Sequence, residues 1–139
     1  MNILLRIKLF VLIIGIAINK SWNIFNFRQG LIRALQDQGH QIIAIAPRDE
    51  YVARLEEMGC VCVHLPVTDT GSNPLVELWA IFKFYLILRK YQVDVLLNYT
   101  IKCNLYGSLA ASWKRIPVIC NISGLGPAFL ANSFSYQAD

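Results

Sequence analysis

The sequence has few charged residues and lacks the motifs of several common chemistries. Charged residues make up 16% of its 139 residues and hydrophobic residues 55%, which excludes a disordered chain and favours a largely buried sheet. The net charge of +4 is too small and too dispersed to indicate a nucleic-acid partner. A dinucleotide fingerprint after the first strand, a Walker A sequence and a nucleophile-elbow serine are absent.

Metal-site and disulfide patterns are also missing. The four cysteines contain no pair spaced as C-x-x-C, and only two histidines, His40 and His64, accompany them. Cys60 and Cys62 are two residues apart on a predicted strand, so they point to one face of it. The sequence therefore predicts free thiols in a reducing cytoplasm and no bound metal.

Apolar segments alternate with helical ones in the order of a parallel α/β sheet. Strands are predicted at 10–18, 41–46, 60–65, 93–98 and 118–122, and helices at 24–38, 51–58, 74–91 and 104–115. Near-continuous apolar strands indicate a sheet covered on both faces. Right-handed crossovers then predict a Rossmann-like, doubly wound sheet of order 3-2-1-4-5.

The run 10–18 also resembles the apolar part of a signal peptide or a membrane anchor. It is too short to span a bilayer, which needs about 20 residues, and no small-residue cleavage site follows it. We interpret it as the central strand of the sheet. Residues 1–9 are then a leader, and residues 10–139 form one domain.

Three polar or glycine-bearing loops are predicted to meet where the strand order reverses. Ligands bind at that point in open α/β sheets, and glycines let the backbone approach a ligand closely. The alternative is ordinary capped loops and plain turns. The predicted cleft residues are Asn19, Ser21, Trp22, Asn23, Thr100, Lys102, Asn104, Ser123, Gly124 and Gly126.

Four ordered motifs resemble one known family. They are Ser21-Trp22-Asn23-Ile24-Phe25-Asn26-Phe27-Arg28, Ala46-Pro47 with Asp49-Glu50-Tyr51, Tyr99-Thr100-Ile101-Lys102-Cys103-Asn104 with Tyr106-Gly107-Ser108, and Asn121-Ile122-Ser123-Gly124-Leu125-Gly126. Over residues 10–133 the chain resembles the N-terminal domain of bacterial family-four glycosyltransferases of the GT-B type. Cys103 departs from the pattern, which has proline there.

The resemblance implies retaining transfer of a sugar from a nucleotide-sugar to a hydroxyl, commonly on a lipid-linked saccharide, in surface polysaccharide biosynthesis. It implies no cofactor and no metal in the active site. The donor would be held mainly by a second domain that is absent after Asp139, so the chain alone is expected to be inactive.

No catalytic residue is identified, and Lys102 either faces a diphosphate or is a solvated lysine. The alternatives are a non-catalytic binding module or partner subunit, and a relative such as a sugar-nucleotide epimerase.

The predicted helix 75–91 is apolar on two sides. One side is expected to pack on the sheet and the other to touch an anionic lipid surface. The alternative for the second side is burial against the leader or a missing domain. The predicted location is the cytoplasm, with peripheral contact at the inner face of the membrane. The predicted sheet side is Leu75, Leu78, Trp79, Phe82 and Leu86, and the predicted lipid side is Ile81, Phe84 and Leu88 beside Lys83, Arg89 and Lys90.

Overall fold

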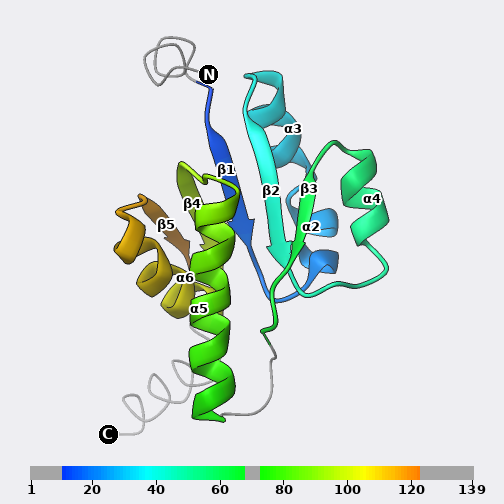
Figure 1. The fold of residues 1–139 in the computed structure, drawn as a ribbon. Coiled ribbons are helices and arrows are strands. Elements are labelled where there is room, and N and C mark those ends of the chain that lie inside the picture. Colours follow the sequence, from blue (N-terminus) through cyan, green and yellow to red (C-terminus); the bar gives the residue numbers. More distant parts are fainter. Residues whose placement is uncertain (1–10, 68–72, 123–139) are drawn as a thin grey trace, which may run out of the picture.

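Five strands alternate with five helices along the part of the chain that the structure describes. The structure is a computed structural model that describes residues 11–67 and 73–122. Figure 1 shows the elements in chain order. They are β1 (Ile13–Ala17), α2 (Ser21–Phe27), α3 (Gln29–Asp37), β2 (Gln41–Ala46), α4 (Val52–Glu57), β3 (Val61–His64), α5 (Pro74–Lys90), β4 (Val95–Tyr99), α6 (Ile101–Lys114) and β5 (Val118–Asn121).

The strands form a single parallel sheet in the order β3-β2-β1-β4-β5. The predicted fold class and strand order are therefore confirmed. At the centre, Ala17 of β1 pairs with Ile45 of β2 on one side and with Asn98 of β4 on the other. Because all strands run the same way, the loops after β1 and β4 leave from the same edge, next to each other.

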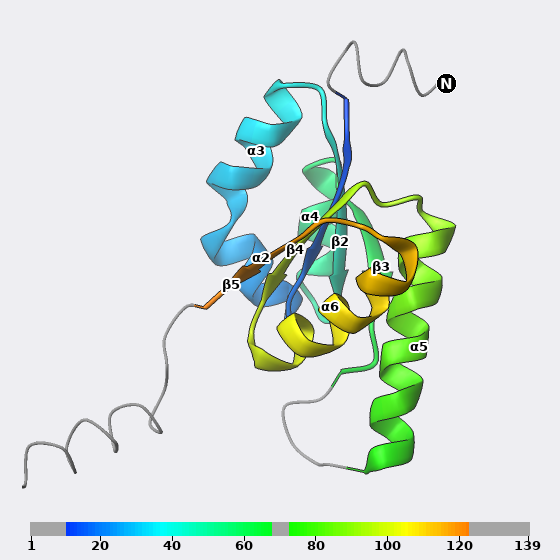
Figure 2. The same ribbon diagram turned by 90° about the vertical axis from the view of Figure 1, so that its left-hand side faces the viewer.

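Helices cover both faces of the sheet, as Figure 2 shows with the sheet nearly edge-on. Successive strand residues pack against the helices on opposite faces of the sheet, because side chains in a strand point to alternate faces. Ile14, Ile16 and Ile42 pack with α2, α3 and α4, whereas Ala17, Ile43 and Ile45 pack with α5 and α6. Fully buried Ile32 and Phe84 contribute to the two layers respectively. The strands are thus apolar on both sides because both sides are covered.

The first helical segment differs from its prediction. One helix was expected up to Gly39, but the structure contains α2 and α3, separated at Arg28 with φ −121° and ψ 9°. The backbone hydrogen bonds from Arg28 N to Ile24 O and from Ile32 N to Arg28 O persist across the break. Gly39 follows α3 with φ +91°, which glycine adopts without strain. The break redirects the chain around Arg28 without a proline or glycine at that position.

Helix α5 is rotated relative to its predicted orientation. Phe84 and Leu88, predicted to face lipid, are fully buried against the sheet, and the buried side also includes Ala80 and Ile87. The residues predicted to face the sheet are mostly exposed, among them Leu75, Leu78, Trp79 and Phe82. Since both sides of the helix are apolar, their periodicity could not choose between them.

Helix α6 begins earlier than predicted and β1 is shorter. The helix starts at Ile101 instead of 104, so Lys102 and Asn104 lie in its first turn instead of in a loop. The first strand is limited to Ile13–Ala17 within the predicted run 10–18. The remaining predicted elements agree to within one or two residues. In the described ranges, none of the helices has both the length and the apolar character needed to cross a bilayer.

Candidate functional site

A pocket of about 410 Å³ lies at the carboxyl edge of the sheet, beside the ends of β1 and β4. Its walls come from the segment after β1, from α2 with the residue that follows it, and from the β4–α6 junction. The described lining residues are Ile18, Asn23, Phe27, Arg28, Tyr99 and Thr100. The pocket thus lies at the reversal of strand order, where ligands bind in folds of this class.

Thr100 joins β4 to α6 in a conformation that is unusual for any residue except glycine. Its φ is +73° and its ψ is 153°, and a side chain held there stores about 1–3 kcal/mol of strain. Its hydroxyl oxygen Oγ1 is buried and has no hydrogen-bond partner among the described residues. The strained junction places a threonine in the pocket wall with an unsatisfied hydroxyl.

Arg28 is a pocket residue that the sequence analysis quoted within a motif but did not select. Its guanidinium carbon lies 4.1 Å from the centroid of the Tyr99 ring, a cation–π contact. Its Nε is buried, with no hydrogen-bond partner in the part of the chain that the structure describes. The sequence held a signal: Arg28 stands four residues after Ile24 and four before Ile32, both fully buried. A cation at helical spacing between two core residues points towards the interior.

The polar residues after β1 divide between the pocket and a structural contact. Asn23 lines the pocket, and its Nδ2 lies 3.5 Å from Oδ1 of Asn19. Ser21 is buried and donates its hydroxyl to the carbonyl of Pro47 at 3.1 Å. The backbone N–H of Trp22 donates to the Asp49 carboxylate at 3.1 Å. Ser21 and Trp22 therefore tie α2 to the loop after β2, and Asn23 is the residue that faces the pocket.

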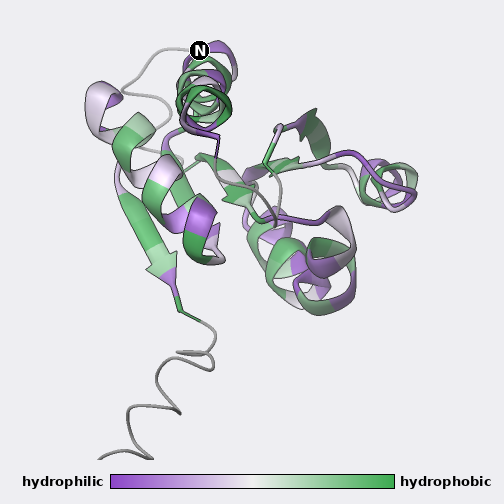
Figure 3. Cartoon of the chain, turned by 90° about the horizontal axis from the view of Figure 1, so that it is seen from below, coloured by the Kyte–Doolittle hydropathy of each residue, from purple (hydrophilic) through white to green (hydrophobic). Residues whose placement is uncertain are grey.

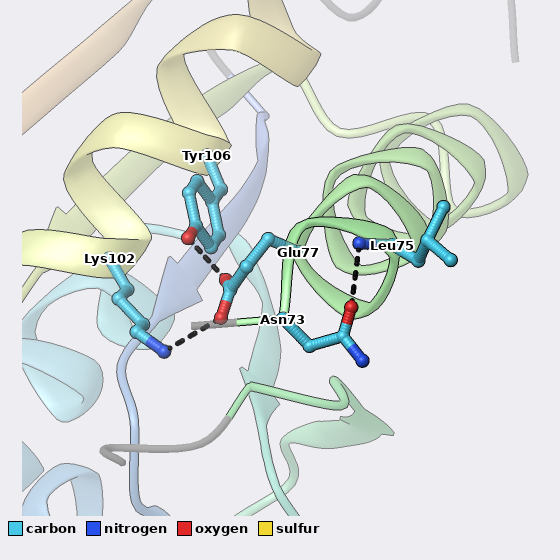
Figure 4. Close-up of polar contacts among 5 residues, drawn as sticks. All are labelled: Asn73, Leu75, Glu77, Lys102 and Tyr106. Atoms are coloured by element: carbon cyan, nitrogen blue, oxygen red, sulfur yellow. Dashed lines mark hydrogen bonds and ion pairs between the residues drawn. The ribbon is translucent and has the colours of Figure 1, made fainter. Parts of the chain in front are cut away.

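Lys102 of α6 is paired with an acidic residue of α5. Its Nζ lies 3.1 Å from Oε1 of Glu77, and the Tyr106 hydroxyl donates to Oε2 of the same carboxylate (Figure 4). The Tyr106 hydrogen bond, followed by that of Lys102, lowers the pKa of Glu77, and the bond to Glu77 raises the pKa of Tyr106. Lys102 thus links α5 to α6, and it is not among the residues that line the pocket.

Asn104 connects α6 to β5. Its Nδ2 donates to the backbone carbonyl of Asn121 at 3.2 Å, while its Oδ1 is buried without a partner in residues 11–67 and 73–122. The predicted cleft residues that come next, Ser123, Gly124 and Gly126, lie outside the described residues. The prediction that these glycines allow close approach of a ligand stays a prediction.

The described lining supplies side chains that can bind a ligand through charge and hydrogen bonds. It offers the guanidinium of Arg28, the hydroxyl of Thr100 and the amide of Asn23, with no carboxylate or imidazole among the described lining residues. In the described ranges, no three potential metal ligands lie together. Burial raises the pKa of the Cys60 and Cys62 thiols to about 11, so both are poor nucleophiles. The arrangement suits recognition of an anion or of hydroxyls.

Comparison with known proteins identifies similar sequences and folds. The model of Glycosyltransferase Family 4 matches residues 29–137. A curated relative from Campylobacter jejuni, N,N'-diacetylbacillosaminyl-diphospho-undecaprenol alpha-1,3-N-acetylgalactosaminyltransferase, is 30% identical over 122 residues, covering 87% of this chain and 32% of its own length. The chain therefore spans about a third of that relative.

Two solved structures share the fold at low sequence identity. A glycosyltransferase from Rickettsia africae superposes with a TM-score of 0.65 at 19% identity, covering 78% of this chain and 29% of its own. MurG from Acinetobacter baumannii superposes with a TM-score of 0.63 at 19% identity, covering 86% of this chain and 38% of its own. In both, the likeness covers well under half of the larger protein.

Proposed function

Because this chain belongs to glycosyltransferase family 4, we propose that it supplies the acceptor-binding half of a retaining enzyme that moves a sugar from a nucleotide-sugar to a lipid-linked saccharide. One observation carries the proposal: the pocket at the carboxyl edge is bounded by Asn23, Arg28 and the strained Thr100. Strain of this kind persists where the surrounding structure enforces it, commonly at binding sites.

The acceptor assignment is supported by the named substrate of the Campylobacter jejuni relative, a diphospho-undecaprenol saccharide. A second support is that the described lining contains no carboxylate or imidazole that could act as a general acid or base. Binding the donor's sugar and completing the reaction therefore require further residues, which a second domain would bring. Asn19, Ser123, Gly124 and Gly126 are proposed to border the same cleft.

A chimera tests this function. Residues 1–139 replace the matching third of the Campylobacter jejuni relative, whose remaining two-thirds supply the donor side. We expect the chimera to transfer N-acetylgalactosamine to the relative's acceptor, and the 139-residue chain alone to transfer none. A folded chimera without transfer would contradict the proposal, and one that bound acceptor without turnover would support a non-catalytic binding module. Turnover by the chain alone would contradict the need for a donor domain.

Two matched asparagines of α2 refine the test. Asn23 lines the pocket, whereas Asn26, three residues along the same helix, is exposed. Asn23→Ala in the chimera is expected to lower kcat/KM at least about tenfold, on the scale of one or two lost hydrogen bonds, and Asn26→Ala to change it less than about twofold. Equal effects would place the acceptor elsewhere.

Contact with a membrane is also proposed, through the outer side of α5 and α6 instead of the side predicted from sequence. We call this the outer apolar surface. Its members are 46% to 76% exposed, and no described residue covers them. They are Leu75, Leu78, Trp79, Phe82, Ile101, Leu105, Leu109 and Trp113.

Ring contacts join the two helices into this one surface. Trp79 lies 6.1 Å from Phe82 between ring centroids, Phe82 lies 6.5 Å from Tyr85, and Tyr85 lies 5.7 Å from Trp113 of α6. Aromatic and apolar side chains with lysines at their margins suit the interfacial zone of a bilayer.

Charge favours an anionic lipid surface over another protein. Helices α5 and α6 contain five basic residues and one acidic residue, Glu77, which leaves four positive charges, as many as the whole chain carries. Basic residues beside an apolar face are attracted to anionic headgroups by about 1 kcal/mol each. Binding there would bring the pocket to the height of a lipid-linked acceptor.

A further inference from the structure

Arg28 holds a positive charge in the pocket wall without a counter-charge among the described residues. Its Nε is buried and bonds to no group, and no hydrogen bond or ion pair joins its guanidinium to the described part of the chain. The Tyr99 ring, 4.1 Å from the guanidinium carbon, is its described side-chain contact. Tyr99 is itself buried, so the aromatic face holds the guanidinium in one position.

Arg28 is half-buried, and its cation–π contact offsets part of the hydration that the buried Nε loses. A guanidinium stacked on a ring keeps its N–H edge free, because stacking uses the flat face and hydrogen bonds use the rim. That rim matches two oxygens of a phosphate or carboxylate. The arrangement of Arg28 on Tyr99 is therefore completed by an oxyanion in the pocket.

The Thr100 hydroxyl and the N-terminus of α6, at the same wall of the pocket, also favour binding of an anion. The buried Oγ1 of Thr100 has no partner, and a hydroxyl donates a hydrogen bond to an anionic oxygen. Helix α6 begins at the next residue, Ile101, so its N-terminal end lies beside Thr100. A 14-residue helix adds a partial positive charge at that end. The described lining contains no carboxylate that would oppose an anion.

We propose that this pocket is a phosphate-binding subsite in which Arg28 is the principal ligand and Thr100 a second one. The inference rests on the proposed function for its assignment to a substrate: the group bound is the diphosphate of the lipid-linked acceptor. The nucleotide-sugar donor also carries a diphosphate, so the same chemistry has two possible sources, and the second experiment below separates them.

The first experiment measures anion binding without any catalysis. Inorganic pyrophosphate is titrated into the 139-residue chain and followed by the amide resonances of a labelled sample. We expect saturable shifts in residues of the pocket, weakened at least tenfold in Arg28→Gln. Arg33→Gln removes the same charge from an exposed position of α3 and is expected to change the affinity less than twofold.

Equal weakening by both variants would reduce the effect to net charge and overturn the subsite, as would the absence of saturable binding. Arg28→Lys keeps the charge without the planar rim and is expected to fall between the wild type and Arg28→Gln. Circular dichroism of each variant checks the fold. If Arg28→Gln fails to fold, wild-type affinity in Arg28→Lys would overturn the role of the guanidinium.

The second experiment assigns the phosphate to a substrate in the chimera described above. Arg28→Gln is expected to raise the KM for the acceptor at least fivefold while leaving the KM for the nucleotide-sugar unchanged. A rise confined to the nucleotide-sugar would overturn the acceptor assignment. If the chimera is inactive but pyrophosphate still binds through Arg28, the proposed function fails and the anion subsite stands. If the chimera is active and indifferent to Arg28→Gln, the subsite fails and the function stands.

Discussion

The helices on the two faces of the sheet expose different kinds of residue to solvent; Figure 3 colours each helix by the hydropathy of its residues. On one face, α3 buries Ile32 and exposes polar residues such as Arg33 and Asp37. On the other, α5 buries Phe84 and also exposes Trp79. One apolar stripe is enough to attach a helix to a sheet. Among the described residues the second stripe on α5 and α6 is left exposed, and it is the surface proposed above to contact a membrane.

The largest expected effect is on stability, and it distinguishes substitutions on the buried side of α5 from those on its exposed side. Phe84→Ala should lower the free energy of unfolding by about 3–5 kcal/mol, because it empties a fully buried site. Phe82→Ala removes a ring that is 46% exposed and should cost less than about 1 kcal/mol. Urea unfolding followed by circular dichroism measures both. Similar losses would contradict the orientation of α5.

The second prediction tests what the outer apolar surface contacts. Leu78→Ser/Trp113→Ser should weaken flotation of the chain with vesicles of phosphatidylglycerol and phosphatidylcholine, on the order of tenfold or more, because each side chain loses about 1–2 kcal/mol of apolar transfer. Leu31→Ser/Trp22→Ser makes the same replacements on the opposite layer, where both residues are exposed, and should leave flotation unchanged. Equal recovery of both variants with the vesicles would rule out a lipid contact at this surface.

A third prediction compares one glycine from each layer. A Cβ on Gly107 of α6 would lie 2.7 Å from the Asn98 amide and 2.9 Å from the Phe84 ring, whereas a Cβ on Gly30 of α3 meets no atom within 4 Å. Gly107→Ala should cost about 1–3 kcal/mol through overpacking. Gly30→Ala should raise stability by up to about 1 kcal/mol through helix propensity. Thermal denaturation compares the two, and the same sign for both would contradict the packing described for α6.

The smallest effect concerns the link between α5 and α6. The pKa of Glu77 is lowered from 4.5, mainly by the Tyr106 hydrogen bond and then by Lys102. The link therefore stabilises the folded state fully above pH 4.5, and this stabilisation is lost as the pH falls through the lower pKa of the folded state. Glu77→Gln should cost less than about 1 kcal/mol at pH 7, and the difference should shrink by pH 3. Unfolding titrations at several pH values, with exposed Glu57→Gln as control, measure it. A cost that is independent of pH would exclude the ionic link.

The sequence was sufficient to predict the sheet, because each strand is a short apolar run bounded by glycine, proline or polar residues. It was not sufficient to orient α5, since two apolar sides give the same periodicity and the choice depends on Ala80, which allows close packing, and on the Glu77–Lys102 pair. The break at Arg28 has no proline beside it, and Gly30, two residues later, lies inside α3, so the glycine did not mark the position of the break.

The candidate site was predicted by topology more than by residue type. Asn23 and Thr100 were found because they follow adjacent strands of the predicted sheet. Lys102 was selected for its charge, and its partner on α5 was not visible in the sequence. Arg28 was missed because a basic residue within a helical segment is usually solvated, and its spacing from Ile24 and Ile32 was not weighed; its contact with the Tyr99 ring shows its place in the structure.

The strained backbone at Thr100 sets how mutation and selection act on this chain. Glycine adopts φ +73° freely, so Thr100→Gly would release strain of about 1–3 kcal/mol, a sizeable fraction of the roughly 5–15 kcal/mol that holds a domain folded. The same change deletes the hydroxyl from the pocket wall. A screen that rewards only thermal resistance would enrich glycine at this position, whereas a screen that also scores ligand affinity would retain threonine.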